Sequence, residues 1–290
     1  MSAATLTPTP EAILAVPFPS YHRPLGWAHQ WLCSGDPERK QAAVELLRKL
    51  YERYDHAVAV GQELVLALME SGPSARAEAE VTLQAIDARF AKLDEELLCR
   101  WGRFYKEHGD RYLGLPWLAA TLTAPPNPEE ARPFYVLSLE KYTEAERLRQ
   151  GHYPGINQAT LVFLLGTLVR RAGSASTTAT VPTRELAEAQ ALARRLLEGR
   201  DQWHESLPND RSVWHPATAA EAHLLLQEWD PAAREYRVAV ANSQGAPRDI
   251  ESMGRQVCRI LLGWNAAGAT IPESFTRLDT LFPGMPQWNG

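Results

Sequence analysis

The chain has 290 residues, of which 45% are hydrophobic and 22% are charged, so a core can be buried along most of its length. Its formal net charge of -5 argues against a nucleic-acid-binding protein, which usually carries a strong basic excess. The same charge gives no reason to expect attachment to an anionic membrane, and no stretch of the sequence approaches the ~20 apolar residues that a membrane helix needs.

We predict that the first 24 residues form a proline-rich N-terminal arm, because they hold four prolines before position 20 and no basic segment. The apolar run Ala12–Val16 is too short for a signal peptide, so we expect a cytoplasmic protein.

Helix signals dominate the rest of the chain, because strong helix formers are abundant and alternating β-branched runs are nearly absent. Three helix starts share one device, an N-capping side chain directly before a proline: Asp36-Pro37, Asn127-Pro128 and Asp230-Pro231. The small polar segment 173–182 is expected to be a mobile loop. In chain order, the predicted helices cover residues 26–33, 37–55, 57–70, 74–92, 94–108, 116–122, 128–149, 156–172, 183–199, 214–228, 231–243, 248–267 and 272–281.

A small residue flanked by large apolar ones recurs on these helices, in the spacing of a tetratricopeptide repeat, where two helices must approach closely. We therefore predict an all-α fold, a single tetratricopeptide-like α-solenoid of antiparallel helix pairs over residues 25–290, with degenerate repeats that are clearest over 94–243. A turn before the helix of the second repeat also contributes Pro154-Gly155. The structural positions of the repeats are Trp101, Gly102, Tyr105, Gly155, Ala159, Ala220, Ala232, Tyr236 and Ala239.

Four ordered motifs are similar to those of a bacterial family of tetratricopeptide proteins: Gly102–Lys106, Tyr153–Leu161, Trp214–Ala222 and Glu251–Gln256. That family is related to the TRAF-binding central regulatory region of the apoptosis signal-regulating kinases. The resemblance covers roughly residues 40–270. It implies a non-catalytic regulatory or scaffolding module whose partner is another protein, with a bacterial effector enzyme on a separate chain as one candidate.

Five residues near the first two motifs are candidates for binding that partner. Arg103, Lys106 and Arg111 form a basic cluster that could receive an acidic peptide or an anionic ligand, although a solvated helix face is the favoured interpretation. Tyr153 and Asn157 bracket a helix entry, where Asn157 could instead cap or bridge backbone groups.

No motif for catalysis or for a cofactor is found. The histidines show no HExxH spacing, the cysteines form no CxxC pair, and neither a phosphate-binding glycine loop nor a GxSxG elbow occurs. Cys33 shares a helical face with His29, and the favoured interpretation of both is as ordinary residues. We predict no catalytic residue, no metal and no cofactor.

Three functions remain open. The first is a protein-binding scaffold or regulatory subunit that controls a separate effector. The alternative is a small-molecule or peptide sensor, which a pocket lined by Arg103, Lys106, Tyr153 and Asn157 would favour. The third is an enzyme with an unrecognised site, which a cleft holding titratable groups in hydrogen-bond reach would support.

Overall fold

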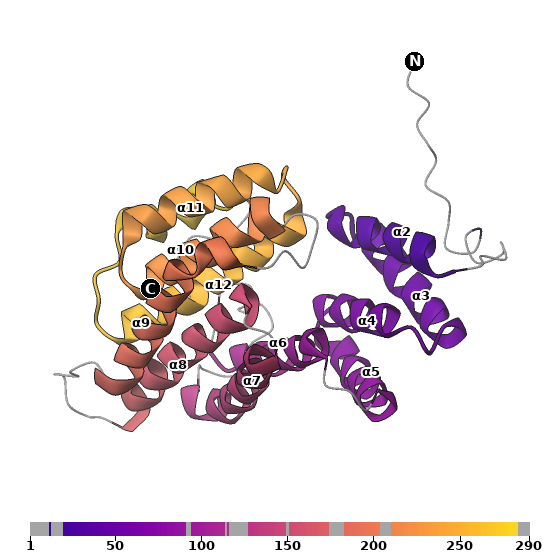
Figure 1. Cartoon of the computed structure of the whole chain (residues 1–290), viewed down its shortest axis with the longest axis horizontal. Helices are drawn as coiled ribbons and strands as arrows, with labels where there is room; N and C mark the ends of the chain where they lie inside the picture. Colours follow the sequence, from indigo (N-terminus) through magenta and orange to yellow (C-terminus); the bar gives the residue numbers. More distant parts are fainter. Residues whose placement is uncertain are drawn as a thin grey trace, which may run out of the picture. The chain divides into compact units, whose positions relative to one another are not determined.

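The computed structural model describes residues 12, 20–90, 94–113, 115, 127–148, 151–173, 183–203 and 210–283. Every regular element in these ranges is helical, so the all-α prediction of tetratricopeptide-like helix pairs is confirmed. The chain divides into two compact units (Figure 1): unit 1 contains Met1–Leu93 and Ala246–Arg248, and unit 2 contains Asp94–Gly245 and Asp249–Gly290.

Within the described residues of unit 1, four helices pack in sequence order, with α2 on α3, α3 on α4 and α4 on α5. A short 3-10 turn, Pro73–Ala75, leads into the last of them. The helices are α2 (His22–Cys33), α3 (Pro37–Arg53), α4 (Val58–Glu70) and α5 (Arg76–Arg89).

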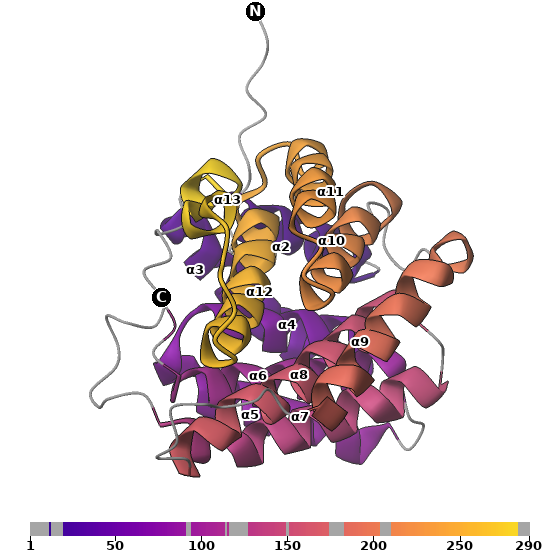
Figure 2. The same cartoon turned by 90° about the vertical axis from the view of Figure 1, so that its left-hand side faces the viewer.

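Unit 2 carries the clearest repeats. Helix α6 packs against α7, α8 against α9 and α10 against α11, and α12 follows them in the chain (Figure 2). A π-helical turn, Asp210–Trp214, leads into α10, and a 3-10 turn, Leu278–Thr280, follows α13. The helices are α6 (Glu95–Asp110), α7 (Pro128–Leu148), α8 (His152–Gly173), α9 (Thr183–Glu198), α10 (His215–Leu225), α11 (Trp229–Asn242), α12 (Pro247–Ala266) and α13 (Glu273–Thr276).

Of the predicted N-caps, Asp36 is confirmed, because its carboxylate accepts hydrogen bonds from the backbone N–H of Glu38 at 2.9 Å and of Arg39 at 3.5 Å. The predicted cap at Asp230 is wrong. Helix α11 begins at Trp229, one residue before Asp230, so Asp230 lies in the first turn of the helix. The side chain of Trp229 packs against Phe275 at a ring-centroid distance of 5.6 Å, a tertiary contact that draws it into the helix.

The helix predicted from 156 begins at His152, so Pro154-Gly155 lies in its first turn rather than in a turn before it. His152 is 5% exposed and stacks on Trp203, with ring centroids 5.3 Å apart. The predicted helix 272–281 is broken into α13 and a 3-10 turn.

Three further predictions lie wholly or mostly outside the described residues: the helix at 116–122, the loop at 173–182 and the N-terminal arm at 1–24. The prediction of one solenoid over 25–290 stays a prediction.

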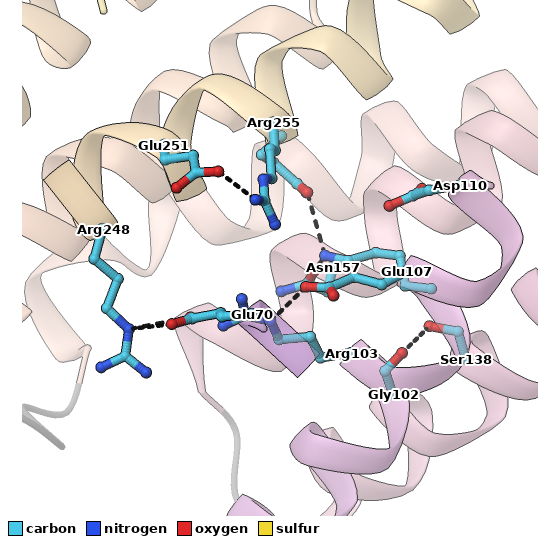
Figure 3. Close-up of polar contacts among 12 residues, drawn as sticks. Glu70, Gly102, Arg103, Glu107, Asp110, Ser138, Asn157, Arg248, Glu251 and Arg255 are labelled. Atoms are coloured by element: carbon cyan, nitrogen blue, oxygen red, sulfur yellow. Dashed lines mark hydrogen bonds and ion pairs between the residues drawn. The ribbon is translucent and has the colours of Figure 1, made fainter. Parts of the chain in front are cut away.

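The predicted small position at the first crossing of unit 2 is occupied as expected. A Cβ added to Gly102 on α6 would lie 2.8 Å from the ring of Tyr142 on α7, which is fully buried. Ser138, also on α7, donates a hydrogen bond of 2.7 Å to the carbonyl oxygen of Gly102 (Figure 3). The two backbones therefore approach closely because residue 102 has no side chain.

Replacing Gly102 with alanine is expected to lower the free energy of unfolding by about 1–3 kcal/mol, because the added methyl group overpacks the crossing. Gly26 on α2 is the matched control, since a Cβ added there would meet nothing within 4 Å. There alanine should stabilise by about 0.5–1 kcal/mol through its higher helix propensity. Urea denaturation followed by circular dichroism measures both changes, and equal effects would contradict the close-crossing explanation.

Candidate functional site

A cavity of about 60 Å³, lined by polar and apolar side chains, lies among α6, α8, α10 and α12 of unit 2. Helices α6, α8 and α10 are the first helices of the three pairs, so the same side of successive repeats faces it. Helices α6 and α8 carry residues that were predicted to bind a partner. Helices α10 and α12 carry lining residues that were not predicted.

Helix α6 supplies Arg103, Lys106 and Glu107, and helix α8 supplies Tyr153 and Asn157. Both sets follow spacings of three and four residues, which places their side chains on one helical face. Four of the five predicted partner-binding residues therefore line one cavity. Whether they bind a partner stays a prediction.

The fifth candidate, Arg111, follows the last residue of α6 and is not among the residues that line the cavity. Tyr153 is 38% exposed and its hydroxyl oxygen lies 3.5 Å from that of Tyr142. Asn157 serves a structural role as well, because its amide donates a hydrogen bond of 2.9 Å to the backbone carbonyl of Tyr153 one turn earlier.

Lys106 lines the cavity and is 5% exposed. Its ammonium donates hydrogen bonds to the side-chain oxygen of Asn157 and, at 3.2 Å, to that of Gln256. The amide of Gln256 donates in turn to Thr160 at 3.2 Å. This network joins α6, α8 and α12 through side chains that are almost fully buried.

Glu221 on α10 is the acidic residue opposite this network and is 8% exposed. Burial raises the pKa of its carboxyl to about 7, and the charge of Lys106 limits the rise. Burial likewise lowers the pKa of Lys106 to about 7, helped by the charge of Arg259 and opposed by those of Asp110 and Glu221. Burial thus disfavours the charged form of both groups, because each charge is held away from water.

Below the network, Arg259 on α12 forms a buried ion pair with Asp110 at the end of α6. The side chains are 4% and 0% exposed, and the guanidinium Nε lies 3.1 Å from both carboxylate oxygens. The hydroxyl of Tyr135 donates to the same carboxylate at 2.9 Å. This cluster fixes α6, α7 and α12 to one another beneath the cavity.

The arginines at the rim have acidic partners on their own helices (Figure 3). Arg103 pairs with Glu107 at 2.7 Å, and Arg255 pairs with Glu251. The basic cluster predicted on α6 is thus partly neutralised. A group entering the cavity meets alternating charges and amides rather than a purely positive surface.

Sequence reasoning missed the contributions of α10 and α12. On α10, Thr218 and Glu221 are three residues apart. On α12, Arg255 and Arg259 follow Ser252 at offsets of three and seven residues. The sequence signal that could have found them is a polar stripe of this spacing on helices that are otherwise largely buried.

Neither a cysteine nor a histidine lines the cavity within the described part of unit 2. In the ranges that the structure describes, no group of three or more His, Cys, Asp or Glu is placed to hold a metal ion. None of the described helices has the length and apolar character needed to cross a membrane.

Comparison with protein families gives one match. Residues 39–162 match the model of the family described as TPR-S, Tetratricopeptide Repeats-Sensor. The match supports a tetratricopeptide-type repeat family and covers less than half of the chain, from α3 into α8. A search of the curated proteins finds no match. Arg103, Lys106, Tyr153 and Asn157 lie inside the matched range, whereas the residues of α10 and α12 lie outside it.

Proposed function

We propose that this chain is a non-catalytic protein-interaction module that takes a polar side chain of a partner protein into the cavity of unit 2. The observation that carries the proposal is the shared face: α6, α8, α10 and α12 each turn polar side chains toward one cavity. Repeat proteins form extended binding surfaces in this way, because equivalent helices of successive repeats line the same side.

The size of the cavity favours a protein partner over a complete small molecule. Pockets that enclose drug-sized ligands usually measure roughly 300–1,000 Å³. At about 60 Å³ the cavity holds a few water molecules or the end of one side chain. A peptide segment lying over the mouth could insert such a group and leave the rest of its contacts outside.

The charges of the cavity suggest what that group is. Lys106 and Glu221 face the same small space with the amides of Asn157 and Gln256, so donors and acceptors are both present. An amide or hydroxyl side chain of the partner satisfies both kinds without adding a charge. A buried group left without partners would cost about 1–3 kcal/mol, which gives the site its selectivity.

Two variants of the cavity test the proposal with the tagged full-length chain as bait in its host. Ser252→Trp fills the mouth without changing the charge, and Arg255→Glu reverses a charge at the rim. Arg237→Glu makes the same reversal on an exposed residue of α11 outside the cavity. We expect a stoichiometric protein partner that is lost, by at least about tenfold in affinity, with the first two variants and kept with the third. A partner that binds all three equally would contradict the proposal.

A small-molecule sensor is the second candidate, favoured by the description of the matched family and by the buried ionisable pair in the cavity. Native mass spectrometry of the same preparation separates the two functions. A bound small molecule that is released on denaturation and is absent from Ser252→Trp, with no protein partner, would replace the interaction proposal by the sensor.

In its finer form, the proposal makes the partner an effector protein whose activity the module controls. The resemblance of the motifs at 102–106 and 153–161 to those of regulatory tetratricopeptide modules supports it. An effector assay with and without the wild-type chain and Ser252→Trp tests it. An effector activity that does not change with the wild-type chain would exclude regulation while leaving binding intact.

A further inference from the structure

Three ionisable side chains of unit 1 form a connected series. Nε2 of His29 lies 3.7 Å from the sulfur of Cys33, and Nδ1 of the same ring lies 3.2 Å from a carboxylate oxygen of Glu63. His29 and Cys33 are one turn apart on α2, and Glu63 comes from α4. The carboxylate thus holds the imidazole so that its other nitrogen faces the sulfur, an arrangement that activates thiols in general.

Cys33 differs from the other two cysteines in access to solvent. It is half-buried, whereas Cys99 is 3% exposed and Cys258 is 0% exposed. The imidazole beside it is open to solvent, since the side chain of His29 is 58% exposed. Cys33 is therefore the least enclosed of the three cysteines.

The charged groups around the thiol come from three segments of unit 1. His29 lies on α2, the helix of Cys33, and Glu63 and Glu70 lie on α4. Arg248 belongs to the short segment Ala246–Arg248 of unit 1, at the start of α12. Arg248 is 3.2 Å from Glu63 and 3.0 Å from Glu70, so two carboxylates compensate its charge. The position of the thiol at the end of α2 opposes ionisation, because the helix dipole is negative there.

The balance of these effects lowers the pKa of Cys33. Burial raises the pKa of Cys33, but the hydrogen bond to His29 and the charges of His29 and Arg248 bring it below its usual value. Hydrogen bonds to Cys33 and Glu63 raise the pKa of His29 to about 10. Burial raises the pKa of Cys258 to about 12 and that of Cys99 well above its usual value. Near neutral pH only Cys33 combines exposure with a cationic neighbour.

We propose that Cys33 is a modification site that exchanges with low-molecular-weight disulfides, with His29 and Glu63 as its positioning residues. The site lies in unit 1 and does not depend on the function proposed for unit 2.

The exchange balances without any further oxidant. The thiolate of Cys33 attacks one sulfur of the small disulfide, a mixed disulfide forms, and the bond between the two reagent sulfurs breaks. The second half of the reagent leaves as a thiolate and takes a proton from solvent. The imidazole of His29 is placed to stabilise the attacking thiolate and takes no part in this proton balance.

The test exposes the folded full-length chain to oxidised glutathione over a series of pH values, with peptide mass spectrometry as the readout. We expect a glutathione adduct at Cys33 that forms at least about tenfold faster than adducts at Cys99 and Cys258. The pH midpoint of its rate should lie below the value of about 8.5 that is usual for a free thiol.

Two variants separate positioning from simple exposure. His29→Gln and Glu63→Gln should each raise the pH midpoint toward that of a free thiol, whereas His56→Gln should leave it unchanged. His56 is a suitable control because it is an exposed histidine 3.7 Å from a carboxylate, that of Asp55, and far from Cys33 in the sequence. A wild-type midpoint equal to that of a free thiol, or equal rates at all three cysteines, would overturn the proposal even if a variant failed to fold.

Discussion

Replacing Asp110 with alanine is expected to lower the free energy of unfolding by about 3–5 kcal/mol, because it leaves the charge of Arg259 buried and uncompensated. Burial alone would lower the pKa of Arg259, but the charge of Asp110 and the hydrogen bonds to it raise that pKa above its usual value. The arginine stays charged when its partner is removed, because a guanidinium does not deprotonate in proteins. The hydroxyl of Tyr135 loses its acceptor in the same variant.

The control is a second ion pair of similar geometry at the surface. Arg48 pairs with Glu78 at 2.6 Å, and their side chains are 38% and 40% exposed. Arg48→Ala should cost no more than about 1 kcal/mol, since solvent screens an exposed pair. Urea denaturation measures both variants. An Asp110→Ala cost as small as that of Arg48→Ala would show that the buried pair does not fix α6 to α12.

The double variant Asp110→Leu with Arg259→Met refines this test. Two apolar side chains of similar volume remove the uncompensated charge, so we expect much of the lost stability to return. The same variant removes one wall of the cavity, which makes stability and partner binding separable.

Replacing Trp264 with alanine is expected to cost about 3–5 kcal/mol, as for other large aromatic side chains removed from a core. Trp264 on α12 is 1% exposed and packs on Phe163 of α8, with ring centroids 4.7 Å apart. Its indole N–H donates a hydrogen bond of 2.9 Å to the carbonyl of Leu224 on α10. One side chain therefore holds α12 against α8 and α10.

A phenylalanine at the same position divides this effect into two parts. Trp264→Phe keeps most of the apolar contact and loses the hydrogen bond, which leaves the carbonyl of Leu224 without the indole donor. We expect a cost of about 1–3 kcal/mol for this variant. If differential scanning calorimetry gave the same loss for both substitutions, the packing against Phe163 would contribute little.

The sequence by itself determined the helices and the local grouping of candidate residues. Periodicity and the cap at Asp36 act within one or two turns, so they were visible without a structure. The spacing of Arg103 with Lys106, and of Tyr153 with Asn157, placed each pair on one helical face for the same reason. The glycine at 102 marked a crossing because only a close approach of two helices requires it there.

Local signals failed where tertiary packing was stronger. Asp230 has the side chain of an N-cap, but the contact of Trp229 with Phe275 extends the helix past it. His152 is likewise drawn into α8 by its stack on Trp203. At Asp230 the aromatic contact outweighs a cap, which contributes only about 1 kcal/mol.

Only the tertiary structure decided what lies opposite the predicted residues. Asp110 and Arg259 are 149 residues apart in the chain, and Lys106 and Gln256 are 150 apart. No periodicity within a helix relates such positions, because their contact depends on how successive helix pairs stack. The cavity is therefore a product of repeat packing: the sequence placed polar side chains on single helices, and the stacking of those helices made them one site.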